Sequence, residues 1–590
     1  MLSSLFRSHA APTLVAKTVS LIISIVLVYK IIVHYTFGFP LLIEGILQII
    51  FSEVNDHKQR RRYQRYEQQM NDVEGLGEKA ASRSECVAAV IGYREDPDLF
   101  HKCLASYRED TSGTVRVLVI GIDGNEEKDM RMAKTAEDVF GADGTPTISL
   151  EESFGALAGR MINDWKVQRS QEEKVGNLKE DELHDHILDV LLRQATATLQ
   201  ERGLLHHCRT NGAAKVICIS QPHNSKKEIM FSAFLFTLAL ARANNIPFIW
   251  SSDSDSYLIT TASPIHRVLS TMSADPTIAG SCGALQIHNA HESTITRLVS
   301  ATYWTDLALT SGQNSAFDVT DCQPGPCAAF AEPALSSILV PWYAQTFLGA
   351  RPLVNEDRHL STQLLARGHK VTFHPRGLVM TDAPSTLAAW IVQQVRWSRA
   401  IVLESLAHPR VLCSRNPVLA LYALRRVAGP YVQAWILCRY LARGKTTAVT
   451  SLADIVARVL LCSAYTAGWR GVGWRVWPWL CASQVFLQFP QPPIVMWASA
   501  TFLDGSWGGL VGMRERGEKK MAMTSSMALL MSFGKAWAPL ACVAVWVGLV
   551  GAAVCKFLAS IALVGDEGMC AAIGGMVTGA GMLYMLALGY

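Results

Sequence analysis

The chain has 590 residues, of which 50% are hydrophobic and 18% are charged, and its formal net charge is +4. The length predicts at least two structural units, the hydrophobic share is high for a soluble protein, and the small net charge argues against a nucleic-acid-binding protein. The 14 cysteines are scattered, which favours free thiols over a disulfide scaffold. Cys322 and Cys327 could ligate zinc together, but no second cysteine pair or nearby histidine cluster supports a zinc site.

Two apolar runs come first along the chain. The run at 14–39 is long enough to cross a hydrocarbon core of about 30 Å, and no clean signal-peptide cleavage site follows it. A second run at 41–51 is shorter and carries Glu44. We therefore expect an N-terminal transmembrane region of two helices at 1–57.

A basic segment follows these runs. Its positive residues are Lys58, Arg60, Arg61, Arg62 and Arg65. Because cytosolic flanks of membrane helices are rich in Lys and Arg, this segment predicts that the next part of the chain lies in the cytosol. We expect a basic cytosolic linker at 58–83. A solvated linker helix is the plainer interpretation of the same residues, and it also places them in the cytosol.

The middle of the chain, 84–400, alternates short β-rich runs with helical stretches. This pattern predicts an α/β domain around a largely parallel sheet. Buried strands are expected at 86–92, 115–123, 214–220 and 246–253. Ligands of open α/β sheets bind outside the carboxyl ends of the strands, so polar residues after these runs are candidate site residues. The charged, helix-forming region 150–205 is expected to be a surface insertion without chemistry.

Acidic, aromatic and basic side chains follow the predicted strands. Asp253 ends the fourth strand and Asp255 follows it, and two carboxylates at this spacing can share one hard cation with nucleotide phosphates, although the same pattern is common in turns. Tyr93, Glu95 and Asp123 follow the first two strands, where they could stack on a base and hydrogen-bond its edge. Two basic residues, Lys226 and Lys227, come after the third strand. Their ammonium groups could hold a diphosphate, or the two residues could begin a solvated helix.

Two later segments offer groups for catalysis. Asp357 lies at the start of a predicted helix, where its carboxylate could take a proton from an acceptor hydroxyl or cap the helix. Arg396 presents a fork of donors suited to a departing diphosphate, and Trp397 presents a flat face for a sugar ring. An amphipathic interfacial helix with an aromatic anchor is the alternative interpretation of the second segment.

The C-terminal part, 401–590, is rich in apolar segments. Candidates are 418–441, 449–468, 476–503, 535–562 and 568–589. Three prolines at 490–493 cannot continue a straight spanning helix, so 476–503 is interpreted as a bent interfacial or re-entrant element. The middle domain and the basic loop at 512–520 both look cytosolic, so an even number of crossings must lie between them. We therefore expect six spans, two before and four after the middle domain, with interfacial helices and a transmembrane channel region at 401–590.

The order of these motifs resembles the processive family 2 glycosyltransferases, which include the hyaluronan, chitin and cellulose synthases. The order is Asp-Ser-Asp at 253–255, Glu-Asp-Arg-His-Leu at 356–360, Gln-Gln-Val-Arg-Trp at 393–397, and then membrane spans. The nearest likeness is to hyaluronan synthases and related fungal capsule or cell-wall polysaccharide synthases. It extends from about residue 53 to 507 and includes Gly-Tyr-Arg-Glu-Asp-Pro at 92–97, Asp-Met-Arg-Met-Ala at 129–133, Gln-Pro-His at 221–223 and Lys-Lys-Glu at 226–228.

This resemblance implies an α/β GT-A (Rossmann-like) cytosolic catalytic domain inserted between α-helical transmembrane segments. It implies a multi-pass enzyme, expected in the plasma membrane, that polymerises UDP-activated hexoses with inversion and translocates a β-linked extracellular or cell-wall polysaccharide, hyaluronan-like or chitin/glucan-like. Expected partners are a UDP-sugar donor (UDP-GlcNAc, with UDP-GlcA or UDP-Glc as further candidates), the nascent polysaccharide and membrane lipids, without nucleic acid. The implied cofactor is Mg²⁺ or Mn²⁺.

The resemblance also implies roles for individual residues. UDP would be held by Tyr93, Glu95, Asp123, Lys226, Lys227, Asp253 and Asp255, and Asp255 would ligate the metal. Asp357 would be the general base, with Glu356 and Arg396 as further catalytic residues and Arg358 in support. The acceptor site and channel entrance would be lined by Cys322, Arg358, Gln393, Gln394, Arg396 and Trp397. Trp507 would lie in a gating loop.

Some positions depart from the family pattern. The run after Cys322, at 323–329, differs from the usual Gly-Pro-Leu-Gly; Asn355 replaces a glycine; and the loop around Trp507 lacks the usual Thr-Arg. The identity of the sugar therefore stays open. Two alternatives also stay open: a non-processive UDP-sugar transferase that acts on a lipid acceptor, and a membrane transporter with a nucleotide-binding regulatory domain.

Overall fold

The chain divides into two compact units. Unit 1 comprises Met1–Ile50, Asn289–Thr310 and Ala383–Tyr590, and unit 2 comprises Phe51–His288 and Ser311–Asp382. The computed structural model describes residues 41–75, 84–110, 112–171, 180–208, 214–411, 417–444, 452–504, 526–561 and 566–588. The predicted membrane run at 14–39, the basic loop at 512–520 and Trp507 lie outside the described residues.

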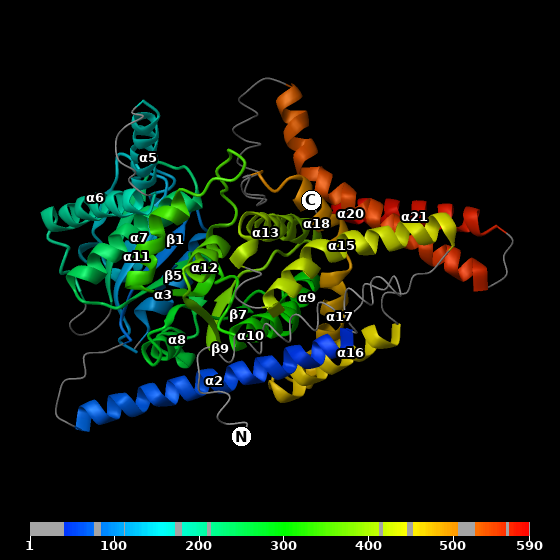
Figure 1. Ribbon diagram of the computed structural model, residues 1–590, viewed down its shortest axis with the longest axis horizontal. Coiled ribbons are helices and arrows are strands. Elements are labelled where there is room, and N and C mark those ends of the chain that lie inside the picture. Colours follow the sequence, from blue (N-terminus) through cyan, green and yellow to red (C-terminus); the bar gives the residue numbers. More distant parts are fainter. Residues whose placement is uncertain are drawn as a thin grey trace. The chain divides into compact units, whose positions relative to one another are not determined.

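Unit 2 is built on a nine-stranded sheet in the order β3-β4-β2-β1-β5-β8-β7-β9-β6, drawn as arrows in Figure 1. The strands are β1 (Cys86–Gly92), β2 (Val115–Asp123), β3 (Thr147–Ser149), β4 (Lys215–Gln221), β5 (Phe248–Asp253), β6 (Tyr257–Leu258), β7 (Ile278–Ile287), β8 (Ala328–Ala331) and β9 (Lys370–Thr381). From β3 to β5 the pairing is parallel, whereas β8 is antiparallel to β5 and β7 and β6 is antiparallel to β9. Strand β7 is parallel to β9, so the predicted α/β class is confirmed and most strand pairings are parallel, although the sheet is mixed.

Helices surround this sheet. They are α3 (Pro97–Arg108), α4 (Arg131–Phe140), α5 (Phe154–Gln171), α6 (Glu180–Glu201), α7 (Lys226–Ala243), α8 (Pro264–Ser273), α11 (Glu332–Tyr343) and α12 (Glu356–Ala366). Helix α7 packs on β1 and β2 and is buried along almost its whole length. Because helices cover the sheet, the first strands are apolar on both faces, as in buried parallel sheets generally.

The region predicted as a surface insertion at 150–205 contributes to this packing. Helix α6 buries a row of leucines and other apolar residues, among them Leu183, Ile187 and Leu191, and it contacts α7 and α11. An apolar stripe at this helical spacing is the side of a helix that faces a core. This part of the predicted insertion therefore forms an outer helical layer over α7, with one face buried and the other exposed.

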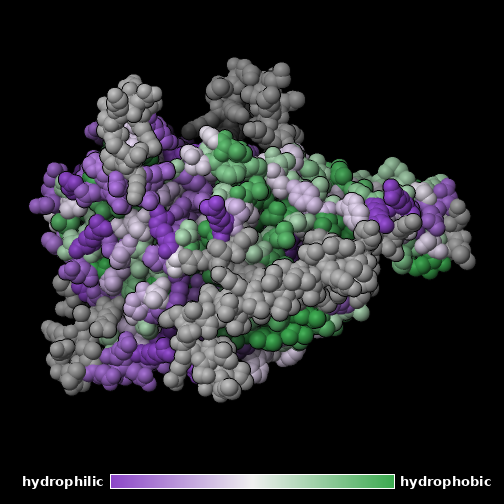
Figure 2. Space-filling view, viewed as in Figure 1, coloured by the Kyte–Doolittle hydropathy of each residue, from purple (hydrophilic) through white to green (hydrophobic). Residues whose placement is uncertain are grey.

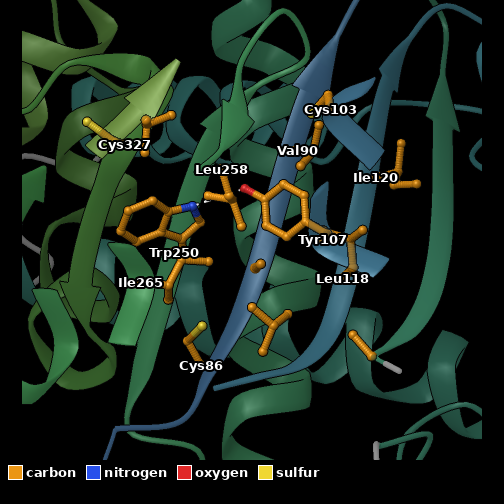
Figure 3. Packing of buried hydrophobic residues seen from close by; sticks show 14 of the residues in the cluster. Cys86, Val90, Cys103, Tyr107, Leu118, Ile120, Trp250, Leu258, Ile265 and Cys327 are labelled. Carbon is orange, nitrogen blue, oxygen red and sulfur yellow. Dashed lines mark hydrogen bonds between the residues drawn. The ribbon is translucent and has the colours of Figure 1, made fainter. Parts of the chain in front are cut away.

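A hydrophobic core of unit 2 is formed largely by buried residues of β1, β2 and β5. In Figure 3 the hydroxyl of Tyr107 points toward the indole of Trp250, and the indole Nε1–H donates to that hydroxyl at 3.1 Å. Both rings are fully buried, so this bond satisfies polar atoms that would otherwise lose their water partners. The thiol of Cys86 packs in the same cluster. Every cysteine among the described residues is free, as expected.

The predicted basic linker at 58–83 is helical over the part that the structure describes, 58–75. Helix α2 (Leu41–Gly75) runs without interruption from the second apolar run through the basic segment. Its buried Asn55 donates to the carbonyl of Phe373 at 3.0 Å, while Lys58 pairs with Asp318 at 3.0 Å and Arg62 pairs with Asp275 at 3.0 Å. These contacts attach the second half of α2 to the side of unit 2, because several of its positive charges find acidic partners there.

Unit 1 is helical in its described part. Its elements are α9 (Thr294–Thr302), a π-helical turn at Tyr303–Leu307, the start of α10 (Ala308–Ala316), α13 (Leu387–Ala407), α15 (Pro417–Arg443), α16 (Leu452–Ala464), a second π-helical turn at Tyr465–Trp469, α17 (Trp477–Gln488), α18 (Gln491–Ala500), α20 (Ser526–Ile561) and α21 (Glu567–Leu588). The predicted bend at the prolines is present, since α17 ends at Gln488 and α18 begins at Gln491. Hydrophobic residues gather over unit 1 in Figure 2, whereas hydrophilic residues dominate unit 2.

Two described helical segments are long and apolar enough to cross a membrane, Trp537–Ile561 of α20 and Glu567–Leu586 of α21. They pack closely through glycines: a Cβ on Gly551 would lie 2.1 Å from Thr578 Oγ1, and one on Gly574 would lie 2.2 Å from Cys555 Sγ. Small residues of this kind let apolar helices approach closely in lipid. The predicted total of six spans stays a prediction.

Candidate functional site

Four neighbouring strands of unit 2 end at one edge of the sheet. The strands β4, β2, β1 and β5 are adjacent and mutually parallel, so their carboxyl ends meet there. Tyr93 and Glu95 follow β1, Asp123 ends β2, Lys226 and Lys227 begin α7 after β4, and Asp253 ends β5. The expectation that these side chains come from adjacent strand ends is therefore met by the topology.

Tyr93 and Asp123 are linked by a histidine. The imidazole of His223 stacks on the Tyr93 ring with centroids 4.0 Å apart and an interplanar angle of 10°. The same imidazole places Nδ1 2.9 Å from the Oδ2 atom of Asp123, and the backbone N–H of Asn224 donates to Oδ1 at 3.2 Å. The hydrogen bond to Asp123 raises the pKa of His223, because it favours the protonated imidazole.

The loop that carries Tyr93 is held by a buried ion pair. Arg94 has a left-handed backbone, with φ of 47°, and its Nε donates to Oδ1 of the fully buried Asp129 at 2.6 Å. Gly124 follows β2 so closely against Asp129 that a Cβ there would lie 2.3 Å from its Oδ2. The pair joins the loops after β1 and β2, which fixes the position of Tyr93 against the end of β2.

Three carboxylates gather at the end of β5. Glu95 accepts from the Ser254 hydroxyl at 2.8 Å, and Asp255 accepts from the Ser256 hydroxyl at 2.7 Å. Burial, together with the negative charges of Asp253 and Glu95, raises the pKa of Asp255 to about 7. Desolvated carboxylates that repel one another fit a divalent cation, which supplies the missing positive charge, and their oxygens are the ligands that Mg²⁺ and Mn²⁺ prefer.

Lys226 links this acidic cluster to Glu356, the residue before the predicted base Asp357. Its ammonium lies 2.6 Å from Asp253 Oδ1 and 3.8 Å from Glu356 Oε1. The neighbouring Lys227 is fully buried and lies over the Trp342 ring at 5.2 Å from its centroid, while the Trp342 indole donates to the carbonyl of Glu356 at 2.8 Å. The start of α7 and the start of α12 are thus held side by side.

A strap of seven residues, Asp321–Cys327, runs between Asp357 and the acidic cluster. Its first three residues each contact α12: Asp321 pairs with Arg358 at 2.6 Å, the Cys322 thiol donates to Asp357 Oδ2 at 3.5 Å, and the Gln323 backbone N–H donates to the Ser361 hydroxyl at 2.8 Å. The contacts form because consecutive strap residues face the first turns of the helix. They define where the Asp357 carboxylate sits.

The other half of the strap lies against the end of β5. A Cβ on Gly325 would be 2.6 Å from Asp253 Oδ2, and the Ser252 hydroxyl donates to the carbonyl of Pro326 at 2.9 Å. Cys327 is buried and donates to the carbonyl of Gly283 at 3.3 Å, so Cys322 and Cys327 serve different contacts. One segment therefore contacts both Asp253 and Asp357.

The remaining predicted site residues belong to helix α13 of unit 1. Gln394 is buried there, while Gln393, Arg396 and Trp397 are half-buried. These last three positions share one side of the helix because they are spaced three and four residues apart. Helix α13 is held in unit 1 by Arg399, which donates to the Thr501 hydroxyl at 3.0 Å and pairs with Asp504 at 3.3 Å.

Three residues of the candidate site were not predicted from the sequence: His223, Ser254 and Gln323. His223 belongs to the Gln-Pro-His motif at 221–223, which was noted without a role. Ser254 is the middle residue of Asp-Ser-Asp, and it is pressed so close to β1 that a Cβ on Gly92 would lie 2.4 Å from its hydroxyl. Gln323 is buried and donates to the carbonyls of Ser281 and Ala329, each at 2.9 Å.

Known proteins that are similar to this chain include several hyaluronan synthases. Hyaluronan synthase 2 of Homo sapiens and of Heterocephalus glaber are each 26% identical over 424 residues, which cover 72% of this chain and 68% of the relative. Hyaluronan synthase 3 of Mus musculus is 28% identical over 319 residues, covering 54% of this chain and 50% of the relative. No protein-family model matches the chain.

One solved structure that is similar to this chain is that of a mannosyltransferase from Pyrobaculum calidifontis in complex with GDP-Man and Mn²⁺. It is 12% identical, with a TM-score of 0.36, and the match covers 78% of this chain and 99% of that one. This likeness is too low to bear on function.

Proposed function

We propose that this chain, which is similar to hyaluronan synthases, is an inverting, processive family 2 glycosyltransferase with a GT-A catalytic domain in unit 2. It polymerises UDP-activated sugars into a β-linked, hyaluronan-like or chitin/glucan-like polysaccharide and translocates the product. The observation that carries this proposal is the strap, which joins the carboxylate after β5 to the carboxylate at the start of α12. A transferase needs donor and base held at a set spacing, because reaction depends on orientation of the reacting groups.

The donor side is formed by the strand ends. Tyr93 stacks on the uracil and Asp123 accepts its N–H, while Glu95 lies beside them. Lys226 and Lys227 hold the diphosphate from the start of α7, where the backbone N–H groups also favour anions. Asp255 ligates Mg²⁺ or Mn²⁺, with Asp253 beside it on the nucleotide. When bound, the cation offsets negative charge on the departing UDP.

The acceptor side is formed by α12 and the strap. Asp357 takes the proton from the acceptor hydroxyl as its oxygen attacks the sugar carbon, and a single displacement inverts an α-linked donor to a β-linked product. The Arg358 backbone N–H donates to Asp357 Oδ1 at 2.7 Å, which leaves Oδ2 directed at the Cys322 thiol. Glu356 and Arg358 support this geometry through Lys226 and Asp321.

Unit 1 carries the membrane part of the proposal. Gln393, Arg396 and Trp397 line the acceptor path and the channel entrance, Gln394 supports them from the buried side of α13, and Trp507 gates the site. The apolar segments of α20 and α21 cross the membrane, in a multi-pass arrangement at the plasma membrane with unit 2 in the cytosol. The basic segment of α2 supports this orientation, because positive residues collect on the cytosolic side.

A synthesis assay tests the proposed function. The full chain, purified in detergent or vesicles, is supplied with Mg²⁺ or Mn²⁺ and single UDP-sugars, and both UDP release and polymer length are measured. UDP release and long products with UDP-GlcNAc alone indicate a chitin-like polymer. Activity only when UDP-GlcA is added indicates a hyaluronan-like polymer. Transfer of one sugar to a lipid would contradict processive synthesis, and absence of any UDP release would contradict the proposed activity.

Gly325→Ala is expected to raise KM for UDP-GlcNAc by about tenfold, because its Cβ would lie 2.6 Å from Asp253 Oδ2 and overpacking of this degree costs about 1–3 kcal/mol. Steady-state kinetics check this expectation. Gly159→Ala is the matched control, since a Cβ there meets nothing within 4 Å. An unchanged KM in Gly325→Ala would contradict the role of the strap beside Asp253.

A further inference from the structure

His223 occupies the place that the proposed function gives to the uracil of the donor. Its ring lies parallel to Tyr93 at 4.0 Å, which is a contact distance for stacked rings. An aromatic base inserted between the two rings would need a separation of about 7 Å, twice the contact distance of carbon atoms. A base that uses the Tyr93 ring must therefore move His223, whether it enters between the rings or replaces the imidazole.

The hydrogen bond from His223 to Asp123 also occupies a contact that the proposed function gives to the uracil. The Asp123 carboxylate can only accept, so Nδ1 of His223 carries the proton that lies between them. Uracil likewise presents a ring N–H, flanked by carbonyls, to a carboxylate. Asp123 is almost fully buried, with its side chain 3% exposed, whereas the His223 side chain is 45% exposed. The acceptor is therefore fixed, and the imidazole is the partner that has room to leave.

We propose that His223 is a displaceable placeholder for the uracil, stacked on Tyr93 and bonded to Asp123 until a UDP-sugar takes both contacts. The inference rests on the proposed function, because it takes Tyr93 and Asp123 as the base-binding residues. It adds a role for His223 that limits donor affinity: the free energy of both histidine contacts is given up each time a donor binds. It also keeps Oδ2 of the buried Asp123 hydrogen-bonded between turnovers, while the Asn224 backbone N–H donates to Oδ1.

The placeholder is sensitive to pH. The charged groups facing His223 are Asp123 at the end of β2 and Asp129 in the following loop, and Asp129 is already paired with Arg94; Tyr93 faces it from the loop after β1. Asp123 raises the pKa of His223. Below that pKa the imidazolium is held by an ion pair, and above it only a neutral hydrogen bond remains. Donor affinity should therefore fall as the pH falls through this range.

Equilibrium binding of UDP-GlcNAc to the full chain in detergent with Mg²⁺ tests the proposal. Binding is measured by calorimetry at about pH 6 and about pH 8, on either side of an ordinary histidine pKa. A UDP-sugar is used rather than UDP, because its esterified diphosphate takes up no proton in this range. His223→Ala should bind about fivefold more tightly than the wild type at about pH 6, and this difference should shrink as the pH rises to about pH 8.

Two comparisons isolate the histidine. Any pH effect of Asp255 is shared by wild type and variant, so it cancels in their affinity ratio. His223→Gln retains a donor for Asp123 but neither titrates nor stacks, so it should also bind more tightly than the wild type at about pH 6. His186→Ala, which removes an exposed histidine of α6, should match the wild type.

Weaker binding in both His223 variants at both pH values would overturn the proposal, because it would make His223 a direct contact of the bound nucleotide. An affinity ratio that does not change with pH would also overturn it. Failure of the wild type itself to bind UDP-GlcNAc would instead overturn the donor site of the proposed function.

Discussion

Asp357→Asn is expected to lower the rate of sugar transfer by about 10²–10⁴-fold, the range in which a positioned general base contributes. The substitution is nearly isosteric, and its amide oxygen can still accept the Arg358 backbone N–H that Asp357 Oδ1 accepts at 2.7 Å. The start of α12 should therefore keep its position, while the group that accepts the proton is lost. Turnover is measured as UDP release, and donor affinity is measured separately by calorimetry.

The affinity for UDP-GlcNAc should stay nearly unchanged in this variant, since the donor residues come from the strand ends and the start of α7 rather than from Asp357. Asp164→Asn is the matched control, because it makes the same chemical change at an exposed position of α5 and should leave turnover at the wild-type level. Wild-type turnover in Asp357→Asn would show that another group takes the proton.

The strands that could be predicted are those with uninterrupted apolar sequence. Strands β1 and β2 begin and end where expected, because both faces of each are covered and their residues are apolar or small except for Arg116 and Asp123 near the two ends of β2. Strand β9 could not be recognised in this way. It contains His374, Pro375 and Arg376, which interrupt the apolar pattern, and its pairing with β7 shifts register between Gly283 and Ala284. The close approach of two backbones at this shift, not a sequence pattern, holds the strand in place.

In the candidate site, too, some residues could be predicted from the sequence and others could not. Residues at strand ends could be grouped from sequence, since adjacent parallel strands deliver their ends to one edge. The strap could not, because its contacts with α12 join residues 35 to 38 positions apart, as between Cys322 and Asp357 and between Gln323 and Ser361, and its contacts with β5 span longer separations. The stack of His223 on Tyr93 likewise depends on two loops meeting after separate strands. The catalytic and binding roles of all these residues remain predictions.

Unit 1 holds a polar cluster that no sequence pattern indicated. Arg458 of α16 lies 3.3 Å from Asp306 in the π-helical turn, and their side chains are only 9% and 10% exposed. The same guanidinium donates to Gln484 of α17 at 3.0 Å and to Gln48 of α2 at 3.4 Å. One arginine thus joins four elements of unit 1, two of which, α2 and the π-helical turn, lie far from α16 in the sequence.

Breaking this pair on one side should destabilise unit 1 by about 3–5 kcal/mol, because the charge left behind stays buried without compensation. Asp306→Asn is the sharpest change, since it removes the charge and keeps the shape. Replacing both partners, as in Asp306→Leu with Arg458→Met, should cost much less, because a buried ion pair gains little over apolar groups of similar volume. Denaturation midpoints of the detergent-purified chain measure both, and Glu567→Gln, at an exposed carboxylate of α21, is the control. If the double variant were as unstable as Asp306→Asn, the bonds from Arg458 to the two glutamines, rather than charge compensation, would hold the four elements together.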